Sequence, residues 1–181
     1  MERTLIYRSP ESKEDEFILT IKQIGCNFNL KECNIGEEGL EHYLITEAYR
    51  DHSDQTKGVF CIFYEDEIIG YFSISFKNVN LRVRADESKT TTFIYLEHFA
   101  IKKEYQRKGI GSRILDFIIK EFEPFYSKYN CIYGIILYPL NSQVESFYQK
   151  KEFTLFEEGK YVPIDPDGND IFMFKFTKEG E

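Results

Sequence analysis

The stretch that organises this sequence is Gln106-Arg107-Lys108-Gly109-Ile110-Gly111, which is followed by Ser112 and Arg113. It separates a β-branched and aromatic run at Thr92–Ile101 from a helically spaced apolar stripe at Gly109–Phe122, so it is predicted to join a strand to a helix. Glycines at such a junction let backbone N–H groups converge on an anion, and the helix dipole favours negative charge there. The stretch is therefore predicted to bind a pyrophosphate.

The local charge supports an anion site. The segment from Lys102 to Arg113 has five basic residues and one acid, in a chain whose formal net charge is -8. Such a net charge makes nonspecific attraction to nucleic acid or to anionic lipid unfavourable away from a local basic patch. The spacing fits neither the P-loop nor the dinucleotide fingerprint, so a nucleotide triphosphatase or a Rossmann enzyme is not expected. An ordinary glycine turn with solvated lysines is the alternative interpretation.

The remaining pattern predicts one domain over residues 1–181, because 42% hydrophobic and 17% aromatic residues can bury a sizeable core. Before the strand, glycine loop and helix of residues 92–122, helical spacing predicts helices, and β-branched runs around Glu65–Glu67 predict a hairpin. The polar stretch Lys77–Thr92 is predicted to be a long loop. The predicted helices are Glu14–Ile24 and Gly36–Arg50, and the predicted hairpin strands are Val59–Tyr64 and Ile68–Phe76.

Pro124 is predicted to end the helix that begins at Gly109. The later elements follow from apolar runs and from the proline at position 139. Asp165–Asp170 has the composition of a turn, since its glycine sits at the wrong offset for a calcium loop. The predicted elements are a buried strand at Cys131–Tyr138, a short helix at Asn141–Lys151, and closing strands at Phe153–Glu157 and Ile171–Phe176.

Neither a secretory leader nor a membrane span is expected, because Met1–Phe17 has no apolar stretch of the leader type and no run approaches the roughly 18 apolar residues of a membrane helix. A cytoplasmic protein is the expectation. The four cysteines are widely spaced and form no CxxC pair, so reduced and mostly buried thiols are expected and no metal site is. These cysteines are Cys26, Cys33, Cys61 and Cys131.

Three segments in order resemble the Gcn5-related N-acetyltransferase (GNAT) superfamily: Tyr95–Ile101, then Gln106–Gly111, then Asn141 with Phe147-Tyr148. The resemblance covers about residues 59–157. It implies an α/β fold of the α+β mixed-sheet kind, with a central, mostly antiparallel sheet, splayed fourth and fifth strands, and flanking helices. It also implies acetyl-CoA as the acyl donor, and dimers are common in the family. The residues assigned to acetyl-CoA by resemblance are Phe99, Ala100 and Ile101 through their backbone, Gln106, Arg107, Lys108, Gly109, Ile110, Gly111 and Ser112 at the phosphates, and Asn141 near the pantetheine.

Acetyl transfer to an amine needs a route for a proton. An alkylammonium with a pKa of about 10.4 costs roughly 4 to 5 kcal/mol to deprotonate at pH 7. Glu97 is the candidate base, because the Leu-Glu-x-Phe pattern resembles polyamine-type acetyltransferases in which that glutamate is the proposed base. Strand alternation puts Glu97 and His98 on opposite faces, and His98 is the alternative base. A solvent-facing position or a salt bridge is the structural alternative for Glu97.

The departing thiolate needs a hydrogen-bond donor. Tyr148 matches the tyrosine that the family uses to donate to the sulfur, and a phenol is well suited to this role. Core packing beside Phe147 and Phe153 is the alternative for Tyr148. By resemblance, a backbone N–H of the splayed fourth strand would polarise the thioester carbonyl. The predicted reaction is a direct transfer within a ternary complex.

The acceptor is less constrained. Gly36–Glu67 has nine acidic residues against Arg50 and Lys57. An acidic groove would attract a small cationic amine or a basic peptide, which is the main expectation, although a solvated helix face explains the same charges.

A second resemblance favours another acceptor. Phe28–Ala48 and Ile69–Ser75 look like the acetyltransferase toxins that modify aminoacyl-tRNA. Glu97 stands where the toxin pattern has a small residue, Asn34 and Gly36 are not in the toxin order, and a tRNA binder usually has a broad basic surface. Toxin-like acetylation of aminoacyl-tRNA, and a non-catalytic acyl-CoA-binding module, are therefore the two alternatives.

Overall fold

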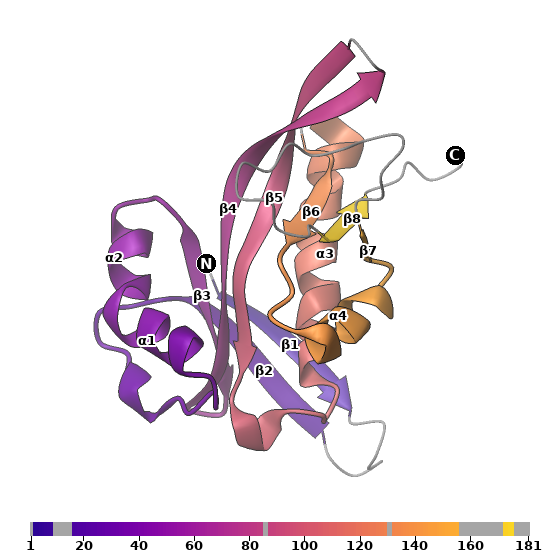
Figure 1. Cartoon of the computed structure of the whole chain (residues 1–181). Coiled ribbons are helices and arrows are strands. Elements are labelled where there is room, and N and C mark those ends of the chain that lie inside the picture. The colour runs from indigo at the N-terminus through magenta and orange to yellow at the C-terminus, as the bar shows by residue number, and fades with distance from the viewer. Residues whose placement is uncertain (1, 9–15, 85–86, 130–131, 156–171, 176–181) are drawn as a thin grey trace. The chain divides into compact units, whose positions relative to one another are not determined.

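The computed structural model describes residues 2–8, 16–84, 87–129, 132–155 and 172–175 (Figure 1). The chain divides into two compact units, the first of residues 1–75 and 97–117, the second of residues 76–96 and 118–181. Strands β4 (Glu67–Arg84) and β5 (Glu87–Ile101) and helix α3 (Ile110–Tyr129) run through both units. One domain over residues 1–181 stays a prediction.

The first unit has the strand order β1-β2-β3-β4-β5. β1 pairs with β2, β2 with β3 and β3 with β4, all antiparallel. Its other elements are β1 (Glu2–Arg8), β2 (Glu16–Gln23), the 3-10 turn η1 (Leu30–Glu32), α1 (Glu38–Thr46), α2 (Ala48–Ser53), β3 (Gly58–Tyr64) and the 3-10 turn η2 (Lys103–Tyr105).

The core of the first unit lies between helices and sheet. Tyr43 and Leu44 of α1 and Ala48 of α2 are buried against apolar residues of β3, β4 and β5. Figure 1 shows α1 and α2 next to β3. Burial of this apolar surface fixes the helices on the sheet. The sheet residues of this core are Val59, Cys61, Ile68, Tyr71 and Ala100.

The second unit contains β6 (Gly134–Leu137), α4 (Ser142–Gln149), β7 (Thr154–Leu155) and β8 (Phe172–Lys175), in the strand order β4-β5-β6-β8-β7. β6 pairs parallel with β5, at Ile94 with Ile135 and Tyr95 with Ile136, and antiparallel with β8. The sheet is therefore mixed and mostly antiparallel with flanking helices, as the predicted fold class requires.

The predicted helix at Glu14–Ile24 is wrong, because its residues 16–23 form β2. Leu19 and Ile21 are buried while Ile18 is 54% exposed, which is the two-residue alternation of a strand. Helical spacing matched the same isoleucines by coincidence. β1 was not predicted, and its pairing along the whole of Glu2–Arg8 supplies the hydrogen bonds that favour the strand in β2.

The predicted loop at Lys77–Thr92 is also wrong, because β4 and β5 extend through most of it. Polar pairs across the two strands explain the extension. Thr92 Oγ1 donates to Asn78 Oδ1 at 2.8 Å, and Thr90 Oγ1 donates to Asn80 Oδ1 at 2.6 Å. Cross-strand pairs of this kind stabilise a ribbon whose polarity suggests a loop.

The predicted end of α3 at Pro124 is wrong as well, since the helix continues to Tyr129. The last turns have anchors beyond the proline, because Tyr126 is buried and the Phe122 and Phe125 rings are 6.1 Å apart. Packing of this kind offsets the hydrogen bond that proline cannot donate.

The other predicted elements are present with shifted ends. The helix at Gly36–Arg50 is divided at Glu47 into α1 and α2, the hairpin is β3 with β4, and the short helix is α4. The cysteines at positions 26, 33 and 61 are free thiols. Cys131 and Asp165–Asp170 lie outside the described residues.

Candidate active site

The glycine loop has the backbone geometry that an anion site needs. Arg107 and Gly109 both have left-handed φ angles, of 60° and 79°, which turn the chain sharply from β5 into α3. The first helical turn closes when Arg113 N donates to Gly109 O at 3.1 Å. The N–H groups at the start of a helix have no partner within it, so those of Ile110, Gly111 and Ser112 suit an anionic ligand. The residues present therefore fit the pyrophosphate of acetyl-CoA.

Gln106 holds this loop in place through its side chain. Its Nε2 donates to Ile101 O at 2.8 Å and to Ile35 O at 3.2 Å. The amide thus ties the loop to the end of β5 and to the segment before α1. Its assigned contact with the phosphates stays a prediction, and the structure adds a positioning role that the sequence did not indicate.

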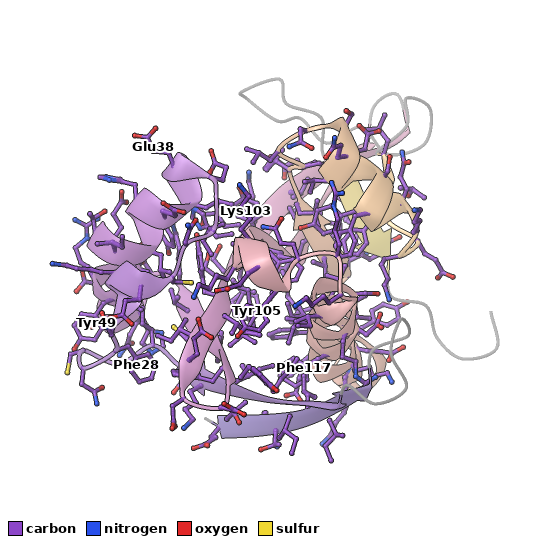
Figure 2. The ribbon with its side chains drawn as sticks, turned by 90° about the horizontal axis from the view of Figure 1, so that it is seen from below. Phe28, Glu38, Tyr49, Lys103, Tyr105 and Phe117 are labelled. Atoms are coloured by element: carbon purple, nitrogen blue, oxygen red, sulfur yellow. The ribbon has the colours of Figure 1, made fainter. Side chains whose placement is uncertain are left out.

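The turn η2 anchors the start of the same loop. Lys103 N donates to Asn34 O at 3.0 Å, and Tyr105 Oη donates to Glu67 Oε2 at 2.6 Å. Lys103 and Tyr105 are labelled on this turn in Figure 2. Lys102 forms ion pairs with Glu67 and Glu104, and its hydrogen bond lowers the pKa of Glu67. Part of the positive charge counted in this segment is therefore neutralised.

The side chains at the end of β5 are largely covered. Ala100 and Ile101 are buried, and Phe99 is half-buried. Gly70 of β4 makes the close packing here possible, because a Cβ at this position would lie 2.5 Å from Ala100 O. The three residues fit the predicted backbone contacts, and contact with acetyl-CoA stays a prediction.

Both candidate bases on β5 have a side-chain partner, which for His98 is at Nδ1. Glu97 Oε1 accepts a hydrogen bond of 2.9 Å from Lys57 Nζ, which also pairs with Asp51 Oδ2 at 3.0 Å. His98 Nδ1 is 2.8 Å from Ser73 Oγ, and its ring stacks on Tyr43 with 3.6 Å between centroids. Burial lowers the pKa of His98. The salt bridge considered as the alternative for Glu97 is thus present, and its role as the base stays a prediction.

The second unit positions the remaining predicted residues on and before α4. Tyr148 is buried, and its ring centroid is 5.5 Å from that of Phe153 and 5.1 Å from that of Phe147. Burial raises the pKa of the Tyr148 phenol, so the hydroxyl keeps its proton and can act as a donor. Packing against aromatic rings and donation to a sulfur are compatible roles for this residue.

Asn141 is the N-cap of α4. Its Oδ1 accepts from Gln143 N at 3.0 Å and from Val144 N at 3.1 Å. This cap gives two backbone N–H groups of the first helical turn a hydrogen-bond acceptor. The sequence pattern of Asn before Ser-Gln-Val could have indicated the cap. The contact with pantetheine stays a prediction.

Sequence reasoning missed the network around Lys57. Asp51, Lys57, Tyr43 and Ser73 come from different elements, and no motif links them. Lys57 and Asp51 entered only as charges in an acidic segment. The sequence held no signal for this network, because two residues that pair in space but lie 40 positions apart, such as Lys57 and Glu97, leave no periodic pattern along the chain.

Within the ranges that the structure describes, no group of three or more His, Cys, Asp or Glu side chains could hold a metal ion. No described helix is long and apolar enough to cross a membrane.

Comparisons with known proteins agree with this geometry. The model of the acetyltransferase (GNAT) family matches residues 27–153, more than half of the chain. No curated protein matches the chain.

Solved structures of similar fold include two toxins. AtaT complexed with acetyl-methionyl-tRNAfMet has a TM-score of 0.72 at 18% identity, over 87% of this chain and 94% of that one. A Tyr-to-Phe variant of AtaT bound to acetyl-CoA and the C-terminus of the antitoxin AtaR has a TM-score of 0.68 at 20% identity, over 87% and 93%. A Tyr-to-Phe variant of KacT has a TM-score of 0.71 at 19% identity, over 87% and 95%.

The fold, the glycine loop at the start of α3 and the family model agree. The chain belongs to the GNAT acetyltransferase family, whose members use acetyl-CoA.

Proposed function

We propose that this acetyltransferase transfers the acetyl group of acetyl-CoA to the α-amino group of an aminoacyl-tRNA. The observation that carries the proposal is the ion pair of Glu97 with Lys57, while burial lowers the pKa of His98 and so makes its imidazole a weaker base. An α-amino group, with a pKa of about 7.7 to 8.0, costs about 3.3 to 3.7 kcal/mol less to deprotonate than an alkylamine. Such an acceptor can lose its proton to water without a protein base.

The acidic segment 36–67 gives less support to a cationic acceptor than its charge suggests. Glu37 Oε2 accepts from Leu40 N, and Glu41 Oε1 accepts from Gly36 N, both at 2.8 Å. Asp51 and Glu67 pair with Lys57 and Lys102. Four of these acids therefore have local structural roles, which favours the solvated-face interpretation over a selector of cationic amines.

The likeness to AtaT complexed with acetyl-methionyl-tRNAfMet supports the same acceptor class. The segments Phe28–Ala48 and Ile69–Ser75 support it independently, since they resemble the toxin pattern. Arg113, in the basic segment around the loop, would supply local attraction for a polyanion in an otherwise acidic chain. The small cationic amine or basic peptide thus becomes the second choice.

The residues have defined tasks in a direct transfer. Bound acetyl-CoA supplies an activated acetyl thioester. The N–H groups at the start of α3 hold its pyrophosphate, and the backbone of Phe99–Ile101 orients the pantetheine arm. The amine nitrogen forms the new bond to the acetyl carbon as the carbon–sulfur bond breaks. Tyr148 Oη donates to the leaving sulfur, and the amine proton goes to water.

The test is acetyl-CoA-dependent release of CoA thiol with methionyl-tRNA, uncharged tRNA, spermidine and a lysine peptide with a blocked N-terminus. Turnover is expected with methionyl-tRNA alone. Glu97→Gln keeps an acceptor for Lys57 and removes the basic carboxylate, so it should retain most of this turnover. Turnover on spermidine that Glu97→Gln abolishes would refute the proposal and establish a small-amine acceptor with Glu97 as base.

A further inference from the structure

The ammonium group of Lys57 lies in surroundings typical of a binding site for an alkylammonium ion. Its Nζ is 2.9 Å from Glu97 Oε1 and 3.0 Å from Asp51 Oδ2. It also lies over the ring of Tyr43, 5.0 Å from the centroid. Carboxylates and the face of an aromatic ring are the groups by which proteins recognise a primary ammonium ion. The chain fills these surroundings with its own side chain.

The groups around Lys57 Nζ come from separate elements and are held firmly. Asp51 belongs to α2, Tyr43 to α1 and Glu97 to β5, and the side chains of Asp51 and Glu97 are 16% and 25% exposed. Stacking on His98 fixes the Tyr43 ring. Burial alone would lower the pKa of Lys57, but its hydrogen bonds to Glu97 and Asp51 outweigh burial and raise that pKa. Lys57 is therefore charged, and its ammonium group fills the space between Asp51, Glu97 and Tyr43.

We propose that Lys57 is a specificity-determining residue, which excludes small alkylammonium acceptors by placing its own ammonium group between Asp51, Glu97 and Tyr43. The inference rests on the proposed function for the acceptor class. A polyamine or a lysine side chain, with a pKa of about 10.4, arrives almost entirely as the ammonium ion, whereas an α-amino group with a pKa of about 7.7 to 8.0 is much closer to its neutral form and depends less on an ammonium site. Closing the site with Lys57 therefore separates the two classes of acceptor.

The test replaces Lys57 by a small residue and supplies the missing atoms. Lys57→Ala removes the side chain from Cγ to Nζ, and n-propylammonium contains those same heavy atoms. The variant is expected to unfold at a lower temperature than the wild type, because Asp51 and Glu97 lose their shared partner. Added n-propylammonium chloride should raise the midpoint in a saturable manner, as a ligand of the folded state does. Equal sodium chloride or n-propanol should not.

Two further variants serve as matched controls. Lys57→Met loses the same charge but keeps the stem, so it leaves no space and should not respond to n-propylammonium. Lys22→Ala removes a lysine that also lies over a ring, 5.4 Å from the Phe63 centroid, and pairs with Glu2 at 3.3 Å. Lys22 is 41% exposed and pairs with a single carboxylate among the described residues, so neither a large fall of the unfolding midpoint nor its rescue by n-propylammonium is expected.

If n-propylammonium raises the unfolding midpoint of Lys57→Ala no more than that of Lys57→Met or Lys22→Ala, the proposed ammonium site is refuted. If Lys57→Ala does not fold alone, its refolding yield with and without n-propylammonium gives the same comparison. The unfolding midpoint and the refolding yield need no acceptor turnover. They therefore test the ammonium site whether or not aminoacyl-tRNA is the acceptor.

The specificity role has its own readout. The ratio of kcat/KM for a diamine to that for methionyl-tRNA should rise at least tenfold in Lys57→Ala. A ratio equal to that of the wild type, despite thermal rescue, would refute the specificity role.

Discussion

Gly70→Ala tests the packing of the strand that is predicted to hold acetyl-CoA. A Cβ at Gly70 would lie 2.5 Å from Ala100 O, 2.9 Å from Ile101 Cδ1 and 3.2 Å from Ile101 Cα. Even favourable carbon–oxygen contacts lie at about 3.3 to 3.6 Å, so β4 and β5 would have to separate by about 1 Å. The carbonyl belongs to the backbone and cannot move aside as a flexible side chain can.

The expected loss has two parts. Overpacking costs about 1 to 3 kcal/mol, and for a chain of this size each kcal/mol lowers the unfolding midpoint by about 2 to 4 °C. The midpoint should therefore fall by about 2 to 12 °C. Because misplacement by 1 Å can cost about a hundredfold in rate, kcat/KM for acetyl-CoA should fall by tenfold or more. Thermal unfolding and acetyl-CoA titration of the folded variant measure the two parts separately.

Gly39→Ala is the matched control. Gly39 lies in α1, where an added Cβ would meet only the carboxylate end of Glu37, at 3.3 Å, and alanine favours the helix. This variant should be as stable as the wild type or slightly more so. Equal midpoints and equal acetyl-CoA affinity for Gly70→Ala, Gly39→Ala and wild type would refute the argument that close approach of β4 and β5 shapes the site.

Tyr148→Phe should lower kcat at least tenfold with little change in acetyl-CoA affinity, because it removes only the donor to the leaving sulfur, and an unchanged kcat would remove Tyr148 from the mechanism. Gly111→Asp should weaken acetyl-CoA binding by more than tenfold, because it places a side chain and a negative charge beside the pyrophosphate. The variant should be as stable as the wild type, since an acid suits the start of a helix. Isothermal titration measures the affinity, and an unchanged value would refute the phosphate-loop assignment. Burial lowers the pKa of His98 below 6.5, so the folded state binds fewer protons there than the unfolded state. The stabilisation is complete above pH 6.5 and is lost as the pH falls toward the folded pKa. Urea unfolding from pH 5 to 8 should show this decline, and His98→Gln should flatten it; an identical slope in the variant would exclude His98 as its source.

Local sequence was a good guide to α3, β3 and β6. The stripe on α3, the alternation of β3 and the continuous apolar β6 all follow from side-chain periodicity, and the glycine loop follows from its neighbours. Predictions failed where a distant strand decided the outcome. β2 is a strand because β1 and β3 supply its hydrogen bonds, and the β4 and β5 ribbon extends because Asn78 pairs with Thr92.

The sequence by itself indicated the family and located the glycine loop that is predicted to bind phosphate, because both depend on order along the chain. Tertiary structure alone showed that Glu97 pairs with Lys57. Lys57 lies 40 positions earlier, and only the folding of α2 and β3 against β5 brings its ammonium group to that carboxylate. Charge pairing depends on distance in space, which a sequence does not record, so the ion-pair partner of the candidate base had to be found in the fold.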